Sequence, residues 1–319
     1  MVWTAYHDRL HQTLRSRQLL SPHQAILLAV SGGQDSLCLA RLFWDLQPKW
    51  GWKLAILHCD HRWRQDSSAN AAHVQTLAQQ WGLPCQIRTA ATPPPSEAAA
   101  RTWRYGVLAE VAQTQGYSAV VTGHTASDRA ETLLYNLMRG SGTDGLAALT
   151  WQRPLAPNIA LVRPLLNWLR SETGQFCQDH QLPIWNDSTN ADRRYSRNRI
   201  RLDLLPQLRH FNAQVDHHLA QTAELLQDDL AYLEAQATHL RQQVQHGTAL
   251  HRPPLQTAAI ALQRRVLRQF LQDHLPQSPT FAHIEKLVAL IAAPPKSQTD
   301  PFPGGAIARV EGDWIRLGQ

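Results

Sequence analysis

The first two-thirds of the 319-residue chain alternate between short apolar runs and amphipathic segments, and this alternation restricts the fold more than any other feature. Such an order is typical of a doubly wound parallel sheet with right-handed crossovers. Strands covered on both faces should be apolar throughout, as residues 25–30 are. The expected strands are 25–30, 54–58, 85–89 and 119–122, and the expected helices are 36–47, 67–81, 96–115 and 127–139. We therefore predict an α/β domain built on a parallel sheet.

A different pattern follows after about Leu205. Apolar residues recur at three- and four-residue spacing from Leu219 to Val244, which predicts one long amphipathic helix. Next come expected helices near 256–275 and 280–292, the latter opened by Ser278-Pro279, and a hairpin turning at Glu311-Gly312-Asp313. We predict two domains, residues 1–208 and a smaller, mainly helical domain of residues 209–319.

The composition excludes some classes of protein. Hydrophobic residues make up 43% of the chain, and no apolar run approaches the roughly 20 residues needed to cross a bilayer, so we expect no membrane span. The N-terminal segment is amphipathic and lacks an apolar signal region, which favours a helix of the mature protein. The four cysteines, Cys38, Cys59, Cys85 and Cys177, form no C-x-x-C pair, which argues against disulfides or a zinc site. A cytoplasmic location fits these features.

A glycine-rich turn separates the first expected strand from the helix after it. Glycines permit unusual dihedral angles and leave the first N–H groups of the helix open to phosphate or pyrophosphate. The expected phosphate-binding residues are Ser31, Gly32, Gly33, Gln34, Asp35 and Ser36. A carboxylate beside phosphate oxygens needs a cation between them, so Asp35 predicts Mg²⁺. The turn has no Walker lysine, which suits chemistry at the α-phosphate with pyrophosphate leaving.

A serine-capped turn without a ligand is the alternative for this segment. We favour phosphate binding because the turn follows the first strand of the doubly wound sheet. In such sheets, ligands collect beyond the carboxyl ends of the strands.

Two further polar clusters follow expected strands. His58 and His61 come at the end of the second strand, where contact with a nucleotide competes with a solvated turn. His124, Asp128 and Glu131 follow the fourth strand, and the two carboxylates share one helical face. Alone, such carboxylates mostly serve as helix-cap and dipole partners. Beside a phosphate-binding turn they suit a cationic co-substrate.

The densest basic run of the chain comes near the end of the first expected domain. Six arginines lie between Arg193 and Arg209, in a chain with a formal net charge of +6. Such a run is usually a solvated helix face. Beside a nucleotide site it suits contact with an RNA backbone, and Arg197 and Arg201 lie one helical turn apart.

Taken together, these segments resemble known motifs. The turn S-G-G-x-D-S resembles the pyrophosphatase loop of the adenine nucleotide α-hydrolase-like superfamily, which has a Rossmann-like fold. Other segments resemble the tRNA(Ile)-lysidine synthetases: H-x-x-H-x-x-R from His58, E-x-x-A-R…R-Y from Glu97, G-H-x-x-S-D-x-x-E-T from Gly123, R-G-S-G-x-x-G-L from Arg139, R-P-L-L from Arg163 and R-N-x-I-R from Arg197. One position departs from the family pattern, because Ser127 stands where the family has an acidic or amide residue.

The resemblance implies an enzyme that uses ATP and Mg²⁺ to join L-lysine to C2 of the wobble cytidine of tRNA(Ile) with a CAU anticodon. The C2 oxygen would be adenylated with release of pyrophosphate, and the lysine amine would then displace AMP. The product, lysidine, changes codon specificity from AUG to AUA. The C-terminal domain would recognise the tRNA. By this resemblance, Arg101 would contact the phosphates and Asp35 would bind the metal. Asp128 and Glu131 would bind and deprotonate the lysine, with His124 nearby. The residues implied in substrate contact are Arg139, Arg197 and Arg201.

Three alternatives stay open. A tRNA thiolation enzyme of the same fold would need suitably spaced cysteines if it used a persulfide or an iron–sulfur cluster. An amidotransferase-type synthetase would need a glutaminase nucleophile. A non-catalytic RNA-binding module would not need Asp35, Asp128 and Glu131. The sequence does not determine the oligomeric state, and a homodimer is one of the alternatives that stay open.

Overall fold

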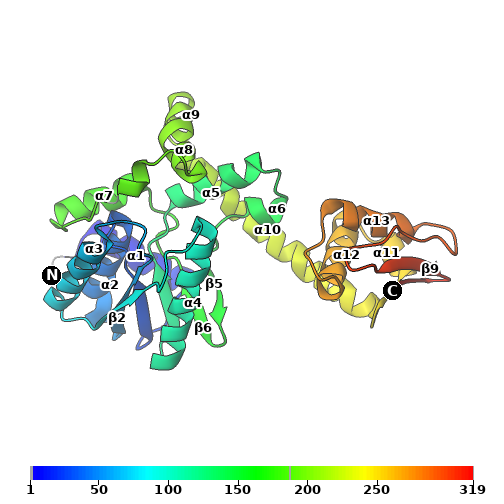
Figure 1. The fold of residues 1–319 in the computed structure, drawn as a ribbon, viewed down its shortest axis with the longest axis horizontal. Helices are drawn as coiled ribbons and strands as arrows, with labels where there is room; N and C mark the ends of the chain where they lie inside the picture. Colours follow the sequence, from blue (N-terminus) through cyan, green and yellow to red (C-terminus); the bar gives the residue numbers. More distant parts are fainter. Residues whose placement is uncertain (1–2, 187, 319) are drawn as a thin grey trace. The chain divides into compact units, whose positions relative to one another are not determined.

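The computed structural model describes residues 3–186 and 188–318, which divide into two compact units, Met1–Leu226 and Gln227–Gln319. The first unit contains a six-stranded sheet with the order β3-β2-β1-β4-β6-β5 (Figure 1). Its strands are β1 (Ala25–Ala29), β2 (Lys53–Asp60), β3 (Cys85–Thr89), β4 (Ala119–Thr122), β5 (Gln152–Ala156) and β6 (Ile159–Val162). All neighbouring pairs are parallel except β5 and β6. The predicted parallel sheet is confirmed.

The β5–β6 hairpin at one edge of the sheet was not predicted. Its outer strand contains Pro154, which has no N–H to donate and is therefore tolerated only where one side of a strand is unpaired. The sequence pattern does not distinguish such a strand from a loop.

Helices cover both faces of this sheet. The helices of the first unit are α1 (Ala5–Ser16), α2 (Gln34–Trp50), α3 (Ser67–Gln80), α4 (Glu97–Gln115), α5 (Ala126–Met138), α6 (Thr143–Leu146), α7 (Arg170–Asp179), α8 (Ser196–Arg199), the π-helical turn η2 (Ile200–Leu204), α9 (Leu205–Phe211) and the first turns of α10 (Val215–Val244). A 3-10 turn, η1, covers Ser188–Ala191. Ser96 caps α4, as its hydroxyl accepts from the Ala99 N–H at 3.2 Å.

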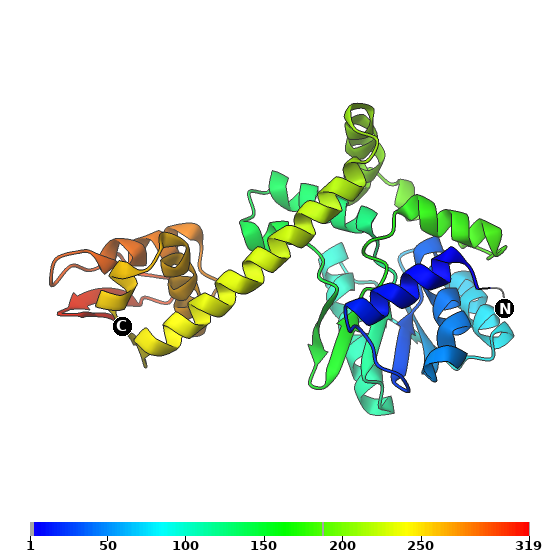
Figure 2. The same cartoon turned by 180° about the vertical axis from the view of Figure 1, so that it is seen from behind.

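Alternate residues of β1 point to the two faces of the sheet. Ile26 and Leu28 belong to a core formed with α1, α2, α3 and α7. Leu27 belongs to the other core, with Leu108 and Val111 of α4. The helix α1 lies in front of the sheet in Figure 2, whereas α4 lies in front in Figure 1. Both faces of the strand are buried, which explains its continuous apolar sequence.

The second unit is mainly helical, with a small antiparallel sheet in the order β7-β8-β10-β9. Its elements after α10 are β7 (Gln245–His246), β8 (Ala249–His251), α11 (Arg252–Thr257), α12 (Ile260–His274), α13 (Phe281–Ile291), β9 (Ile307–Glu311) and β10 (Trp314–Gly318). The predicted hairpin is confirmed, because Glu311 pairs with Trp314 across the turn at Gly312 and Asp313. The helices and the hairpin share one core, which includes Phe270, Leu287 and Ile315.

Three predicted boundaries differ from the structure. The helix α13 is capped by Thr280, whose hydroxyl accepts from the His283 N–H, and not by Ser278-Pro279. The segment predicted as one helix over 256–275 consists of α11 and α12, because Ala258 adopts extended dihedral angles between them. The compact units divide between Leu226 and Gln227 rather than after residue 208, because α9 and the first turns of α10 belong to the first unit.

Candidate active site

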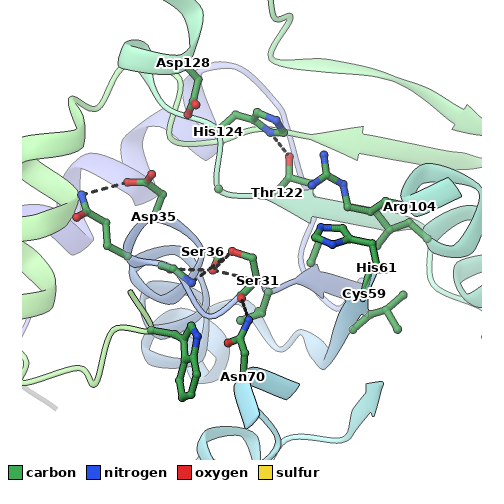
Figure 3. A pocket seen from close by; sticks show the side chains of 18 of the residues that line it. Ser31, Asp35, Ser36, Cys59, His61, Asn70, Arg104, Thr122, His124 and Asp128 are labelled. Carbon is green, nitrogen blue, oxygen red and sulfur yellow. Dashed lines mark hydrogen bonds between the residues drawn. The ribbon is translucent and has the colours of Figure 1, made fainter. Parts of the chain in front are cut away.

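A cavity of about 320 Å³ opens at the carboxyl edge of the parallel sheet (Figure 3). The ends of β1, β2 and β4 contribute Ala29, Leu57 and Thr122 to its lining. The chain winds away from β1 in both directions, since β2 pairs with one side of it and β4 with the other. Ligands of open α/β sheets bind at this kind of topological switch point. The cavity is large enough for part of a nucleotide or a small substrate.

The predicted phosphate-binding turn forms one wall of this cavity. The Ser36 hydroxyl donates to the Gly33 carbonyl at 2.8 Å and accepts from the Ser31 N–H at 3.1 Å. Gly32 has a φ of 89°, and a Cβ there would lie 2.3 Å from Asn70 Oδ1, so this position requires glycine. The turn thus leads tightly into the N-terminus of α2. Five of the six predicted residues line the cavity, namely Ser31, Gly33, Gln34, Asp35 and Ser36.

Asp35 lies at the start of α2 and is held from α7. The Thr173 hydroxyl donates to Asp35 Oδ1, and Arg170 Nη1 lies 3.4 Å from Oδ2. Burial raises the pKa of Asp35 to about 6, although the Arg170 charge acts in the opposite direction. The carboxylate is therefore ionised at neutral pH but protonates readily in mild acid.

Asp35 is also the predicted metal ligand. Mg²⁺ is usually bound by one or two carboxylates together with phosphate oxygens and water. The described residues contain no group of three or more His, Cys, Asp or Glu side chains that could hold a metal ion. A site with Asp35 as a protein ligand and phosphate oxygens as the others fits this arrangement.

His124 and Asp128 line the cavity opposite the phosphate-binding turn (Figure 3). The end of β4 comes very close to α2, because a Cβ on Gly123 would lie 2.7 Å from the Asp35 carbonyl oxygen. Asp128 is the third residue of α5, and its Oδ2 accepts from the Thr125 N–H at 2.8 Å and from the Thr125 hydroxyl at 2.9 Å. The loop and the helix start together fix the direction of the Asp128 carboxylate.

The charges of these two residues follow from their surroundings. Burial lowers the pKa of His124 to about 3, so its ring is neutral, and its Nδ1 lies 2.9 Å from the Thr122 hydroxyl. Burial would raise the pKa of Asp128, but the charges of Arg197 and Arg201 and the hydrogen bond from the Thr125 N–H lower it overall. Asp128 therefore presents a negative charge to the cavity, and His124 presents a polar neutral ring.

Glu131 lies behind Asp128 and does not line the cavity. Its side chain is 1% exposed and accepts two hydrogen bonds from Arg201, from Nε at 2.6 Å and from Nη2 at 2.9 Å. Arg197 lies 3.9 Å from both carboxylates, and Arg201 lies 3.8 Å from Asp128. The structure thus brings the two predicted carboxylates together and pairs them with Arg197 and Arg201, of which Arg201 also lines the cavity.

The two predicted nucleotide-binding histidines have different surroundings. His58 is 3% exposed, and its Nδ1 lies 2.8 Å from the Val30 carbonyl oxygen. Burial lowers the pKa of His58, so the neutral ring donates from Nδ1 and supports the end of β1. His61 lines the cavity and lies beside Trp63, with 4.8 Å between ring centroids. Only His61 of the pair is placed for direct contact with a ligand in the cavity.

Arg101 and Arg139 do not line the cavity. The Arg101 guanidinium lies over the Tyr105 ring, 5.0 Å from its centroid. Arg139 is exposed at the end of α5 and donates to the Tyr135 hydroxyl at 3.0 Å. Arg104, one helical turn after Arg101, is the arginine of α4 that reaches the cavity.

Several residues of the cavity were missed by the sequence interpretation, namely Asn70, Arg104, Tyr105, Arg170 and Trp185. Asn70 Nδ2 donates to the Ser31 carbonyl and the Trp185 N–H donates to the Gly32 carbonyl, both at 3.0 Å. The sequence does contain a signal for Arg104 and Tyr105, because they form the second half of the E-x-x-A-R…R-Y motif. The other three belong to segments without a phosphate-binding pattern, and only the fold brings them to the turn.

The departure from the family pattern at Ser127 has a structural role. Ser127 is buried, and its hydroxyl accepts from the Arg170 N–H at 3.1 Å. Arg170 is the first residue of α7, so its N–H has no partner within that helix. Ser127 therefore joins the starts of α5 and α7 without displacing Asp128.

Comparisons with known proteins identify the family of the chain. Residues 4–208 match the PP-loop domain family, and residues 250–314 match the TilS substrate binding domain. A tRNA(Ile)-lysidine synthase from Nostoc sp. is 58% identical, with 99% of this chain and 98% of that protein covered. One from Synechococcus sp. is 54% identical, with 99% and 97% covered. A chloroplastic tRNA(Ile)-lysidine synthase from Zygnema circumcarinatum is 35% identical, with 88% and 78% covered.

A solved structure shares the fold over much of the chain. The U34-tRNA thiolase NcsA from Methanococcus maripaludis, determined with its [4Fe-4S] cluster, aligns with a TM-score of 0.59 over 70% of this chain and 78% of that one. The sequence identity is 16%, so this likeness concerns the fold alone. In the part of the chain that the structure describes, no helix is long and apolar enough to cross a bilayer.

Proposed function

Because the chain belongs to the tRNA(Ile)-lysidine synthase family, we propose that it uses ATP to join L-lysine to C2 of the wobble cytidine of tRNA(Ile) with a CAU anticodon. The observation that supports this most directly is that the phosphate-binding turn and Asp128 line opposite walls of one cavity. A nucleotide phosphate and a cationic amine can therefore meet there.

The first step would occur at the turn. Ala29, Leu57 and Leu108 give the cavity an apolar wall that suits adenine, and the N–H groups at the start of α2 suit the phosphates. The cytidine C2 oxygen would bond to the α-phosphorus, and the bond to pyrophosphate would break. Mg²⁺ beside Asp35, when bound, would offset charge on the phosphates. Arg104 lines the same cavity and would add positive charge, and Arg101, one helical turn earlier on α4, would add to the positive potential.

The second step would use the opposite wall. The lysine ε-amine has a solution pKa of about 10.4, so it must lose a proton before it attacks C2. Asp128 would attract the ammonium group by its charge, and Glu131 would support Asp128 through the shared arginines. The amine nitrogen would bond to C2, AMP would leave with the C2 oxygen, and the amine protons would pass to water or to Asp128. The neutral His124 ring would offer a hydrogen bond near the reacting groups.

Binding of tRNA would involve the basic segment 193–209 and the second unit. Arg197 and Arg201 are engaged by Asp128 and Glu131, so we assign the leading phosphate contacts to exposed arginines of the same segment. These are Arg193, Arg194 and Arg199, of which Arg193 and Arg194 form ion pairs with Asp203 and Asp192 at the surface, where such pairs are weak. We propose that Arg139, which is exposed at the end of α5, also contacts the tRNA.

The four cysteines are all free thiols, and we propose that the protein works in a reducing cytoplasm.

Assembly of the protein as a homodimer stays a prediction, which a measurement of its mass by sedimentation velocity can test.

Pyrophosphate release tests the proposed function. Purified protein is mixed with ATP, Mg²⁺, lysine and unmodified tRNA(Ile), and each component is omitted in turn. We expect release that requires tRNA(Ile), and lysine incorporation that also requires lysine. A methionine tRNA with the same CAU anticodon is the matched RNA control and should give little release. Absence of release with the complete mixture would contradict the proposal, and sulfur incorporation would identify a thiolation enzyme instead.

A further inference from the structure

Glu224 lies in the first turns of α10, in the part of that helix that belongs to the first unit. Its carboxylate accepts from Arg129 Nη1 at 2.9 Å through Oε2 and from Arg17 Nη2 through Oε1. The Glu224 side chain is 25% exposed, whereas that of Arg129 is 1% exposed. One acidic residue of α10 therefore holds a fully buried arginine of α5 and an arginine that follows α1.

The surroundings of Arg129 leave it little freedom. Its Nε and Nη2 both donate to the Leu149 carbonyl, at 3.1 Å and 2.9 Å. The Trp151 ring contacts both arginines, with the Arg17 guanidinium 4.0 Å and the Arg129 guanidinium 5.3 Å from its centroid. The Arg129 guanidinium is thus bonded along its inner edge to backbone and at Nη1 to Glu224. Because it is buried, its charge depends strongly on that carboxylate.

Arg129 occupies a special place on α5. It follows Asp128 directly and precedes Glu131 by two positions. At about 100° per residue, Asp128 and Glu131 lie on one side of the helix and Arg129 lies on the other. The first two turns of α5 are therefore held from two sides: Thr125 binds Asp128 and Arg201 binds Glu131 on one side, and Glu224 binds Arg129 on the other.

We infer that Glu224 is a positioning residue for the lysine-binding carboxylates, acting through Arg129. This rests on the proposed function, in which Asp128 holds the lysine ammonium. Loss of the Glu224 charge leaves Arg129 buried without its counter-charge, and the easiest relief is a shift of the first turn of α5 toward solvent. Such a shift moves Asp128 away from its place in the cavity, while the phosphate-binding turn on α2 stays where it is.

The test compares Glu224→Gln with Glu234→Gln. Glu234 is a matched control, because it lies on the same helix and its carboxylate also faces two arginines, Arg268 at 2.6 Å and Arg265 at 3.3 Å. We expect Glu224→Gln to raise the lysine KM by about tenfold, with dissociation constants for ATP and tRNA within about twofold of the wild type. Glu234→Gln should leave all three constants nearly unchanged.

Three outcomes would overturn the inference. They are equal lysine KM values for the two variants, a lysine KM for Glu224→Gln that matches the wild type, and a loss of ATP affinity as large as the loss of lysine affinity. If Glu224→Gln does not fold, the lysine KM of the Arg17→Gln variant tests the inference instead. This substitution removes only the outer partner of Glu224, and we expect a smaller rise in lysine KM of about threefold. An unchanged value would then contradict the inference. Wild-type protein without lysine-dependent turnover would instead contradict the proposed function itself.

Discussion

The two walls of the cavity are built in different ways. The phosphate-binding wall is built on six consecutive residues, 31–36, in which the Ser36 hydroxyl bonds to the Ser31 N–H and the Gly33 carbonyl, so its shape depends on local dihedral angles. The opposite wall contains His124 and Asp128; Asp128 is held by Thr125, and Glu131 behind it is held by Arg201 from 70 positions away. The first wall is a property of one short segment, whereas the second depends on distant ion pairs. Substitutions should therefore have separable effects on ATP and on lysine.

The largest expected effect is at Gly32. Gly32→Ala would place a Cβ 2.3 Å from Asn70 Oδ1 in a residue with a φ of 89°. We expect the turn to open and the ATP dissociation constant, measured by titration calorimetry, to rise by about 100-fold or more. Gly82→Ala is the matched control, because Gly82 also has a positive φ, of 66°, but has no atom within 4 Å of its added Cβ. Equal ATP affinity in the two variants would show that the turn does not form the nucleotide site.

A smaller effect, confined to the opposite wall, is expected for Asp128→Asn. The amide oxygen can still accept from Thr125, so the start of α5 should persist, but the charge that attracts the ammonium group is lost. Steady-state kinetics should show a rise of about 30-fold in the lysine KM, or loss of turnover, with nucleotide binding retained. The exposed first-turn residue Asp8 of α1 provides a control, Asp8→Asn, that should change neither. Unchanged lysine dependence in Asp128→Asn would remove the assignment.

Protein stability and Mg²⁺ affinity should both depend on pH through Asp35, which lies in the phosphate-binding wall. Burial raises the pKa of Asp35 to about 6, so between its ordinary value and 6 the folded chain holds a proton that the unfolded chain releases. The unliganded protein should therefore lose stability as the pH rises toward 6, and Mg²⁺ affinity should fall by about tenfold per unit as the pH drops below 6. Denaturation and Mg²⁺ titrations across this range check both statements. An Asp35→Asn variant that keeps both dependences would contradict the assignment to Asp35.

The smallest expected effect concerns RNA contact. Arg199→Gln, at an exposed position, should lower the slope of log affinity for tRNA against log salt by about one. Arg201→Gln should leave that slope unchanged, because its guanidinium is bonded to Glu131. Binding measured at several salt concentrations separates the two. The reverse result would restore Arg201 as a phosphate contact.

The contrast between the walls also explains what the sequence could predict. Periodicity predicted β1 to β4 and the helices between them, because a buried parallel strand must be apolar and a covering helix must be amphipathic. The turn at Ser31 was predictable because its chemistry lies in consecutive residues. The β5–β6 hairpin was not, because Pro154 and short length hide an edge strand.

The rest of the site could not be derived from local patterns. The basic segment predicted Arg197 and Arg201 as RNA contacts, yet the fold places them beside buried carboxylates, where they offset a large desolvation cost. Histidine is a common ligand-binding residue, but His58 of β2 is buried, and its ring bonds to the Val30 carbonyl just after β1. Asn70, Arg170 and Trp185 reach the cavity only because separate elements converge there. Each case depends on tertiary neighbours that no single segment specifies.

A structure of the protein with a non-hydrolysable ATP analogue, Mg²⁺ and lysine tests the central claim most directly. We expect the phosphates on residues 31–36, the metal beside Asp35 and the lysine ammonium within hydrogen-bonding distance of Asp128, all in one cavity. Nucleotide bound elsewhere, or lysine bound away from Asp128 with the phosphates in place, would contradict that claim.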